Sequence, residues 1–126
     1  MTNHKLKPTE AELDILQILW KLGPSTVKTV HEIGSKHKDT GYTTTLKLMQ
    51  IMTEKGLITR ELSGKTHIYT ALITEEHIKS SAVTELVEEV FEGAAMELVI
   101  QTLGHYKPSS EELEEIKKLI SHFESK

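Results

Sequence analysis

Apolar residues recur at helical spacing along the first third of the chain. Over residues 8–23 they mark one face of an α-helix. These apolar positions are Leu13, Leu16, Leu19 and Trp20. Thr9 and Glu12 form a Thr-x-x-Glu capping box at the start, in which each side chain accepts a hydrogen bond from the other residue's backbone N–H. Gly23 and Pro24 end the pattern. The sequence therefore predicts a first helix between Thr9 and Gly23.

Two further helical segments follow. Residues 25–36 carry an apolar stripe, and either Ser25 or Thr26 can cap the helix. The stripe consists of Val27, Val30 and Ile33. Residues 41–56 form a third segment, which ends at Gly56, the residue type that most often terminates a helix.

The periodicity changes from helical to alternating after Gly56. Residues 57–72, LITRELSGKTHIYTAL, are typical of two strands joined by a turn at Ser63-Gly64. Three short helices followed by a hairpin is the order of a winged helix-turn-helix, in which the third helix enters the DNA major groove and the hairpin is the wing. We therefore expect a mostly α fold with a winged-helix DNA-binding domain over residues 1–73.

The third helix has two chemically different faces. Thr45, Leu48, Met49 and Met52 share the face that should pack inward. The opposite face carries Thr43, Lys47, Gln50 and Glu54, flanked by Thr44 and Leu46. Small hydroxyls near a helix N-terminus suit a major groove, because they allow close approach and hydrogen bond to bases or phosphates. The alternative is that Thr43 is only a helix cap.

The wing offers a second set of candidate contacts. Arg60 and Lys65 are placed near the hairpin tip, where long cations can contact a sugar-phosphate backbone. The alternative is that both residues merely keep an edge hairpin soluble.

Three more amphipathic segments are predicted over residues 74–126. The first is a helix capped by Thr74 that runs to Gly93, and the third is capped by Ser109 with Glu112. The residues expected at a subunit interface are Leu86, Val90, Leu98, Leu113, Ile116, Ile120 and Phe123. The last four of these repeat at intervals of 3, 4 and 3, the spacing of a coiled-coil seam. Because three short helices enclose little core, we predict a helical dimerisation domain. Packing back on the winged helix in a monomer is the alternative.

Charge separates the same two halves. The net charge is −4 overall, but residues 1–74 hold ten Lys and Arg against seven Asp and Glu, a net of +3. Residues 75–126 hold five against twelve, a net of −7. A basic first half suggests a polyanionic partner, although acidic helices can also be simply well solvated.

Composition argues against several other classes of protein. The chain has no cysteine, no apolar run of membrane-spanning length and no apolar signal-peptide core in its first ten residues, so we expect a cytoplasmic protein with no membrane partner. It has no Gly-rich phosphate loop and no HExxH motif, and its seven histidines lack metal-ligand spacing. We therefore expect neither an enzyme nor a bound metal or cofactor.

Six segments of the chain together resemble the penicillinase-repressor (BlaI/MecI/CopY) family of bacterial regulators. In order they are LKPTEAELDILQILWKLG, TVKTVHEI, YTTTLKLMQIMTEKGLI, GKTHIYTALI, FEGAAMELV and SSEELEEIKKLI. The resemblance implies a homodimeric transcriptional repressor that binds a palindromic operator through its winged helix. It also implies DNA contacts near Thr26 and Lys28 in the second helix, besides Thr43, Thr44 and Lys47.

Two departures from the family pattern limit this reading. The copper-responsive branch carries a cysteine motif that this chain lacks. In the β-lactam branch a sensor protease cuts at an Asn-Phe pair, and the nearest counterpart here is Gln101-Thr102. A sensor protease is thus still a candidate partner, although this chain lacks the Asn-Phe pair that the protease would cut. The alternative function from another class is a winged-helix protein-interaction module.

Overall fold

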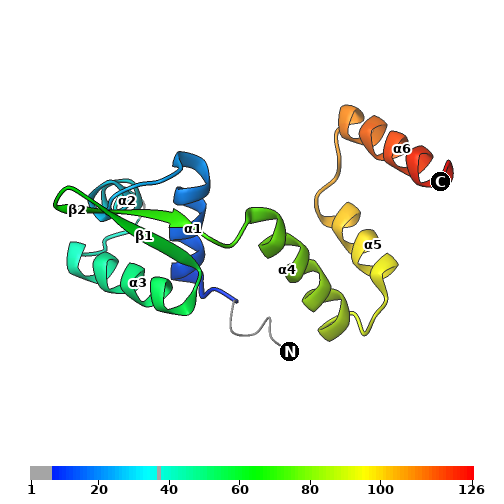
Figure 1. Cartoon of the computed structure of the whole chain (residues 1–126). Coiled ribbons are helices and arrows are strands. Elements are labelled where there is room, and N and C mark those ends of the chain that lie inside the picture. Colours follow the sequence, from blue (N-terminus) through cyan, green and yellow to red (C-terminus); the bar gives the residue numbers. More distant parts are fainter. Residues whose placement is uncertain (1–6, 37) are drawn as a thin grey trace. The chain divides into compact units, whose positions relative to one another are not determined.

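The computed structural model describes residues 7–36 and 38–126. These residues form six helices and a single two-stranded sheet (Figure 1). The elements are α1 (Glu10–Leu22), α2 (Val27–Gly34), α3 (Tyr42–Lys55), β1 (Ile58–Ser63), β2 (Thr66–Ala71), α4 (Glu75–Glu89), α5 (Ala95–His105) and α6 (Ser110–Glu124). This order confirms the predicted fold class, a winged helix-turn-helix followed by a helical C-terminal segment.

The chain divides into two compact units inside α4. The first ends at Ala82 and the second spans Val83–Lys126. The sequence places its boundary earlier, between residues 73 and 74, where α4 has not yet begun. Ile78, in the second turn of α4, packs against the core of the first unit, so the start of this helix belongs with the winged helix.

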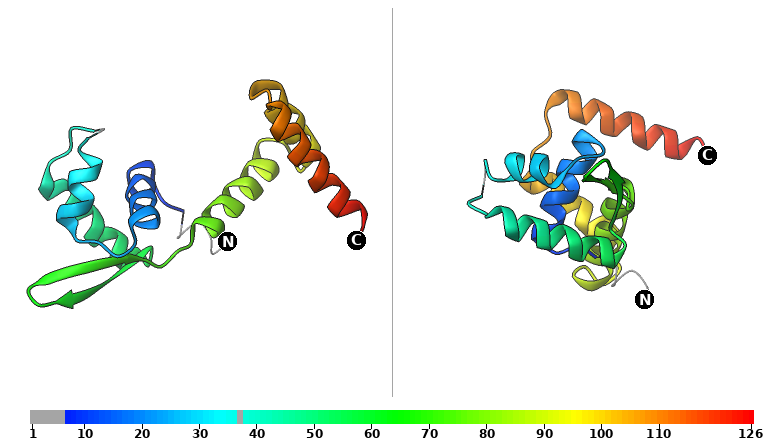
Figure 2. Two further views of the ribbon diagram at one scale, coloured as in Figure 1. Left: turned by 90° about the horizontal axis from the view of Figure 1, so that it is seen from above. Right: turned by 60° about the vertical axis from the view of Figure 1, so that its left-hand side comes forward.

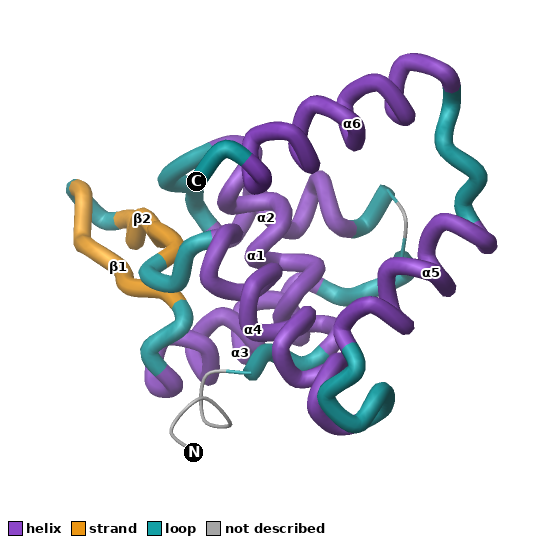
Figure 3. Tube along the Cα trace, turned by 90° about the vertical axis from the view of Figure 1, so that its right-hand side faces the viewer, coloured by secondary structure: helices purple, strands orange, loops and turns teal. Residues whose placement is uncertain are grey.

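The first unit has one continuous apolar core built by α1, α2, α3 and the hairpin. It consists of Ile15, Leu16, Leu19, Val27, Val30, Met49, Met52, Leu57, Ile58, Tyr69 and Ile73. Tyr69 of β2 also pairs with Ser25, ahead of α2, through two backbone hydrogen bonds of 2.8 and 2.9 Å. The hairpin therefore lies beside the helices (Figure 2). Figure 3 shows the strands confined to this hairpin.

The predicted helix ends are largely confirmed. Thr9 and Glu12 form the capping box of α1, Thr26 caps α2, and Gly56 ends α3 in the left-handed conformation with φ 85°. Ser109 with Glu112 forms the capping box of α6. These ends are set by local hydrogen bonds, which is why the sequence predicts them well.

The end of α4 corrects one expectation. The helical pattern of the sequence runs to Gly93, but α4 ends at Glu89, so Val90 and Phe91 lie beyond it. Glu92 and Gly93 both have positive φ, 51° and 89°. Left-handed residues cannot continue a right-handed helix, and they turn the chain toward α5.

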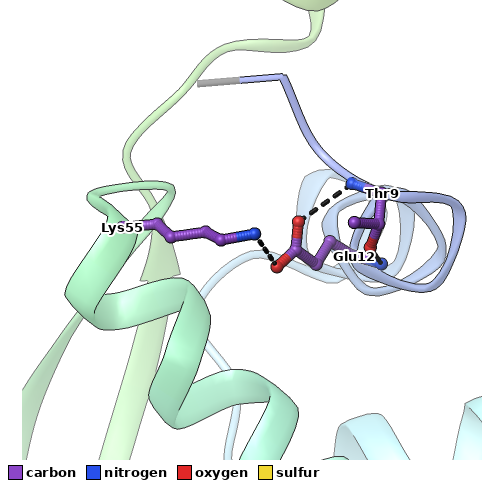
Figure 4. A network of polar contacts seen from close by, with 3 residues as sticks. All are labelled: Thr9, Glu12 and Lys55. Atoms are coloured by element: carbon purple, nitrogen blue, oxygen red, sulfur yellow. Dashed lines mark hydrogen bonds and ion pairs between the residues drawn. The ribbon is translucent and has the colours of Figure 1, made fainter. Parts of the chain in front are cut away.

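A buried ion pair joins the start of α1 to the end of α3. Glu12 of α1 is almost fully buried and accepts hydrogen bonds from the Thr9 backbone N–H (2.9 Å) and from Lys55 Nζ of α3 (2.8 Å), as Figure 4 shows. Burial by itself raises the pKa of Glu12, but the hydrogen bonds from Lys55 and Thr9 outweigh it and hold the pKa below its usual value.

Candidate nucleic-acid interface

The exposed face of α3 has the composition that its helical wheel predicts. Thr45, Met49 and Met52 are buried in the core, and Leu48 is half-buried. The side chains on the outer face are exposed: Thr43, Thr44, Lys47, Gln50 and Glu54. Leu46, on the flank, is half-buried and packs against the core. The outer face is thus polar and carries its cation near the middle of the helix.

The start of α3 excludes the capping explanation for Thr43. The N-cap residue is Gly41, and no side chain caps the helix. Thr43 lies inside the first turn, so its exposed hydroxyl is not used to satisfy a backbone N–H of the helix end. The first-turn N–H groups of α3 are therefore not capped by any side chain. They leave the positive end of the helix dipole without a neighbouring acceptor side chain.

The two α2 candidates have different environments. Thr26 is half-buried, and its side chain accepts a hydrogen bond from the Thr29 backbone N–H at 3.1 Å, so it has a structural task. Lys28 is exposed in the first turn of α2. Of the two, Lys28 has the side chain that is free to reach a phosphate.

The wing residues occupy different parts of the hairpin. Lys65 lies in the two-residue turn after Gly64, whose φ of 65° glycine adopts at no steric cost. Arg60 is not at the tip as expected: it lies in the middle of β1, opposite Tyr69. Because directly opposed residues point to the same side of a sheet, Arg60 shares the helix-facing side with Tyr69. Both cations are exposed.

Ion pairing distinguishes the candidate cations from their neighbours. Lys38 pairs with Asp14 at 2.7 Å, which raises the pKa of Lys38, and Lys55 pairs with Glu12. In contrast, the candidate cations have no ion pair within residues 7–36 and 38–126. They are Lys28, Lys47, Arg60 and Lys65. The four cations that the sequence assigns to a polyanion thus have no carboxylate partner among the described residues, as is also true of other lysines such as Lys21 and Lys36.

The second unit exposes its apolar side chains. No residue of α4, α5 or α6 is buried within the chain. Phe123 is 61% exposed and Ile120 51%, whereas Leu98 and Ile116 are half-buried. The other predicted interface residues, Leu86, Val90 and Leu113, are also exposed. A single copy of this unit therefore leaves its seam in contact with water.

Other kinds of site find no support among the described residues. No group of three or more His, Asp or Glu residues there could hold a metal ion, and no helix is long and apolar enough to cross a membrane. A pocket of about 350 Å³ lies between α1 and α2, lined by residues such as Ile18, Leu22 and Ile33, and contains none of the candidate contacts. The sequence assigned no contact to Tyr42 or His31, whose rings meet only in the folded unit.

A three-helix unit followed by a hairpin wing defines a winged helix-turn-helix protein. The sequence matches the penicillinase repressor family over residues 8–122, and the chain belongs to this family.

Relatives of nearly the same length share low identity with the chain. The methicillin resistance regulatory protein MecI of Staphylococcus aureus strain N315 is 24% identical over 96% of this chain and 98% of its own length. A penicillinase repressor of Staphylococcus aureus is 25% identical over the whole of both chains. Among solved structures, AbfR of Staphylococcus epidermidis aligns with a TM-score of 0.47 and 19% identity, covering 98% of this chain and 79% of that one.

Proposed function

We propose that the chain is a DNA-binding transcriptional repressor that acts as a homodimer on a palindromic operator in the bacterial cytoplasm. The observation that carries this proposal is the outer face of α3, where exposed threonine hydroxyls adjoin an unpaired lysine and nothing in the fold requires them. Membership of the penicillinase repressor family supports it. The function is non-enzymatic: the protein works by occupying its operator.

The proposed contacts divide into two chemical kinds. Thr43, Thr44 and Gln50 read base edges in the major groove, since hydroxyl and amide groups match the donors and acceptors there. The cations neutralise phosphates and set the register on the duplex without reading sequence. These are Lys28, Lys47, Arg60 and Lys65, and Thr26 caps the start of α2, the helix that carries Lys28.

The C-terminal unit is the proposed dimer interface. Its exposed apolar residues would be covered by the same residues of a second copy, because a two-fold dimer uses one patch on both subunits. Two winged helices related by this axis then match a palindromic operator, with half-sites about one helical turn apart.

In vitro selection from random DNA, with the full-length protein, tests this proposal. We expect a palindromic consensus and an affinity that falls steeply with salt, because each neutralised phosphate releases counterions. A winged-helix protein-interaction module, the alternative, would enrich no sequence and respond weakly to salt. Failure to enrich any sequence together with a flat salt response would refute the proposed function.

Lys47→Ala is expected to weaken binding to operator and random DNA alike and to make the slope of log affinity against log salt shallower by about one unit. Thr43→Ala or Thr44→Ala should instead reduce the preference for operator over random DNA, by roughly 1–3 kcal/mol if a good base contact is lost. Fluorescence anisotropy at several salt concentrations measures both quantities. Unchanged operator binding in the variant that combines Thr43→Ala, Thr44→Ala and Lys47→Ala would remove α3 from the interface.

Replacing Arg60 and Lys65 together by alanine is expected to lower affinity for all DNA and to flatten the salt slope by up to about two units. The two single variants separate the mid-strand cation from the turn cation. Because Arg60 lies opposite Tyr69 rather than at the tip, Lys65→Ala alone tests whether the turn reaches a phosphate. A slope that stays unchanged in the double variant means that the wing contacts no phosphate.

Control by a sensor protease stays a prediction. Gln101 and Thr102 are exposed within α5, and the Thr102 hydroxyl donates to the Leu98 carbonyl at 2.8 Å. Intact helical backbone is a poor protease substrate unless it unfolds locally, so cleavage here would require α5 to open.

A further inference from the structure

Tyr42 begins α3 beside the face proposed to read DNA, and the fold does not account for it. Its side chain is 48% exposed, so the core does not require the ring. Its hydroxyl makes no hydrogen bond within the residues that the structure describes. The residue is also not the helix cap, which is Gly41. A large aromatic side chain with a free hydroxyl thus stands at the edge of the interface.

The ring of Tyr42 is nevertheless held in place by α2. It meets the imidazole of His31 edge-on, with ring centroids 5.6 Å apart and an interplanar angle of 83°. Edge-to-face contact is a favoured arrangement of aromatic rings and restricts the rotamers that an exposed tyrosine would otherwise sample. His31 therefore limits where the Tyr42 hydroxyl can point.

His31 is in turn fixed by Thr45, one turn further along α3. The Thr45 side chain is buried, and its Oγ1 lies 3.3 Å from His31 Nδ1 and 3.5 Å from the Gly41 carbonyl oxygen. Thr45 has only one hydroxyl proton. If it donates that proton to Gly41, its oxygen accepts from His31 Nδ1–H, so a continuous chain of contacts joins α2 to the start of α3.

We propose that Tyr42 donates its hydroxyl to a DNA phosphate beside the groove that α3 enters, and that His31 is the residue that positions it. Tyrosine hydroxyls are common phosphate donors in protein–DNA interfaces. The uncapped first turn of α3 adds favourable dipole potential for the same anion. This inference rests on the proposed function and adds two residues to its binding surface.

A neutral donor leaves a different experimental signature from a cation. Tyr42→Phe removes one oxygen and keeps the ring, so we expect about tenfold weaker binding to operator and random DNA alike. The salt slope should stay at its wild-type value, because a hydroxyl releases no counterion. Lys47→Ala, in contrast, should change the slope. Tyr106→Phe, which removes the same group from an 80% exposed tyrosine in the second unit, is the matched control and should bind normally.

The positioning role of His31 is tested by a double-mutant cycle. In a His31→Ala background the ring loses its support, so the further loss on Tyr42→Phe should shrink from about tenfold to less than threefold. His31→Phe keeps an aromatic edge but not the Thr45 hydrogen bond. In this background we expect Tyr42→Phe to cause most of its tenfold loss of DNA affinity again. Circular dichroism melts of each variant establish that the unit stays folded.

The outcomes separate this inference from the proposed function. If wild-type and Lys47→Ala proteins behave as expected but Tyr42→Phe binds normally, the phosphate contact is refuted and the DNA-binding proposal stands. A loss confined to operator DNA would overturn the phosphate assignment in favour of base contact. Additive effects in the cycle would remove His31 as the positioning residue. A wild-type protein that binds no DNA would instead refute the proposed function itself.

Discussion

Lys55→Met is expected to lower the free energy of unfolding of the N-terminal unit by about 3 kcal/mol at pH 7. The substitution leaves the Glu12 carboxylate, 2% exposed as a side chain, with only its bonds to the Thr9 capping box. Leaving one partner of a buried pair uncompensated is what makes such substitutions costly. The Lys55 side chain itself is 38% exposed, which keeps the expected value at the lower end of the range for buried pairs.

Trp20 gives a direct measurement of this effect. It is the single tryptophan of the chain, it packs against the core of the N-terminal unit, and its Nε1–H donates to the Ile73 carbonyl at 3.0 Å. Urea titration followed by tryptophan fluorescence therefore reports this unit and not α5 or α6. Lys79→Met is the matched control, because Lys79 pairs with Glu75 where both side chains are exposed, and should cost less than about 0.5 kcal/mol.

The pH dependence provides a second check on the same pair. The folded-state pKa of Glu12 is below its unfolded value of about 4.3, so the pair stabilises the fold above that pH. Its contribution is lost as the pH falls through the folded-state pKa. The difference between wild type and Lys55→Met should therefore shrink on acidification from pH 7 toward about pH 4.

Glu12→Gln combined with Lys55→Met should recover part of the stability. Glutamine can still complete the Thr-x-x-Gln capping box, and no buried charge is left unpaired. If Lys55→Met were as stable as Lys79→Met, the pair seen between α1 and α3 would not contribute to stability in solution.

Ile116→Glu is expected to shift the protein toward monomer and to weaken operator binding by about 100-fold or more. The reason is the loss of effective concentration, since a linked second winged helix adds roughly 10²–10⁴ in avidity over one half-site contact. The carboxylate would lie in the seam of Leu113, Ile120 and Phe123, where burial against a second copy leaves it unpaired. Sedimentation and operator titration measure the two effects.

Ser121→Glu adds one negative charge to the same helix away from the seam, and it should stay dimeric and bind normally. The tryptophan-detected unfolding of Ile116→Glu should match the wild type, because Trp20 lies in the other unit. If Ile116→Glu remained dimeric with wild-type affinity, this seam would not hold the dimer. A wild-type chain that sediments as a monomer at micromolar concentration would contradict the dimer proposal.

Local chemistry made most of the fold predictable from the sequence. Helix caps such as Thr9 with Glu12, and the left-handed Gly56 after α3, are satisfied by residues a few positions away. The hairpin is predictable for the same reason, because the alternating pattern and the turn glycine, Gly64, are adjacent in the chain. The end of α4 was predicted wrongly because Val90 and Phe91 continue the apolar spacing after the helix has ended.

For the candidate site, the sequence by itself determined which residues of α3 face outward, since helical periodicity alone separates Lys47 from Met49. Only the tertiary structure decided which cations are free. Lys55 and Lys47 are on one helix, but Lys55 reaches Glu12 across the unit while Lys47 has no ion-pair partner among the described residues. The tertiary structure likewise brings His31 of α2 against Tyr42 of α3. Contacts between helices depend on how the core packs them together, and periodicity within one helix carries no information about that packing.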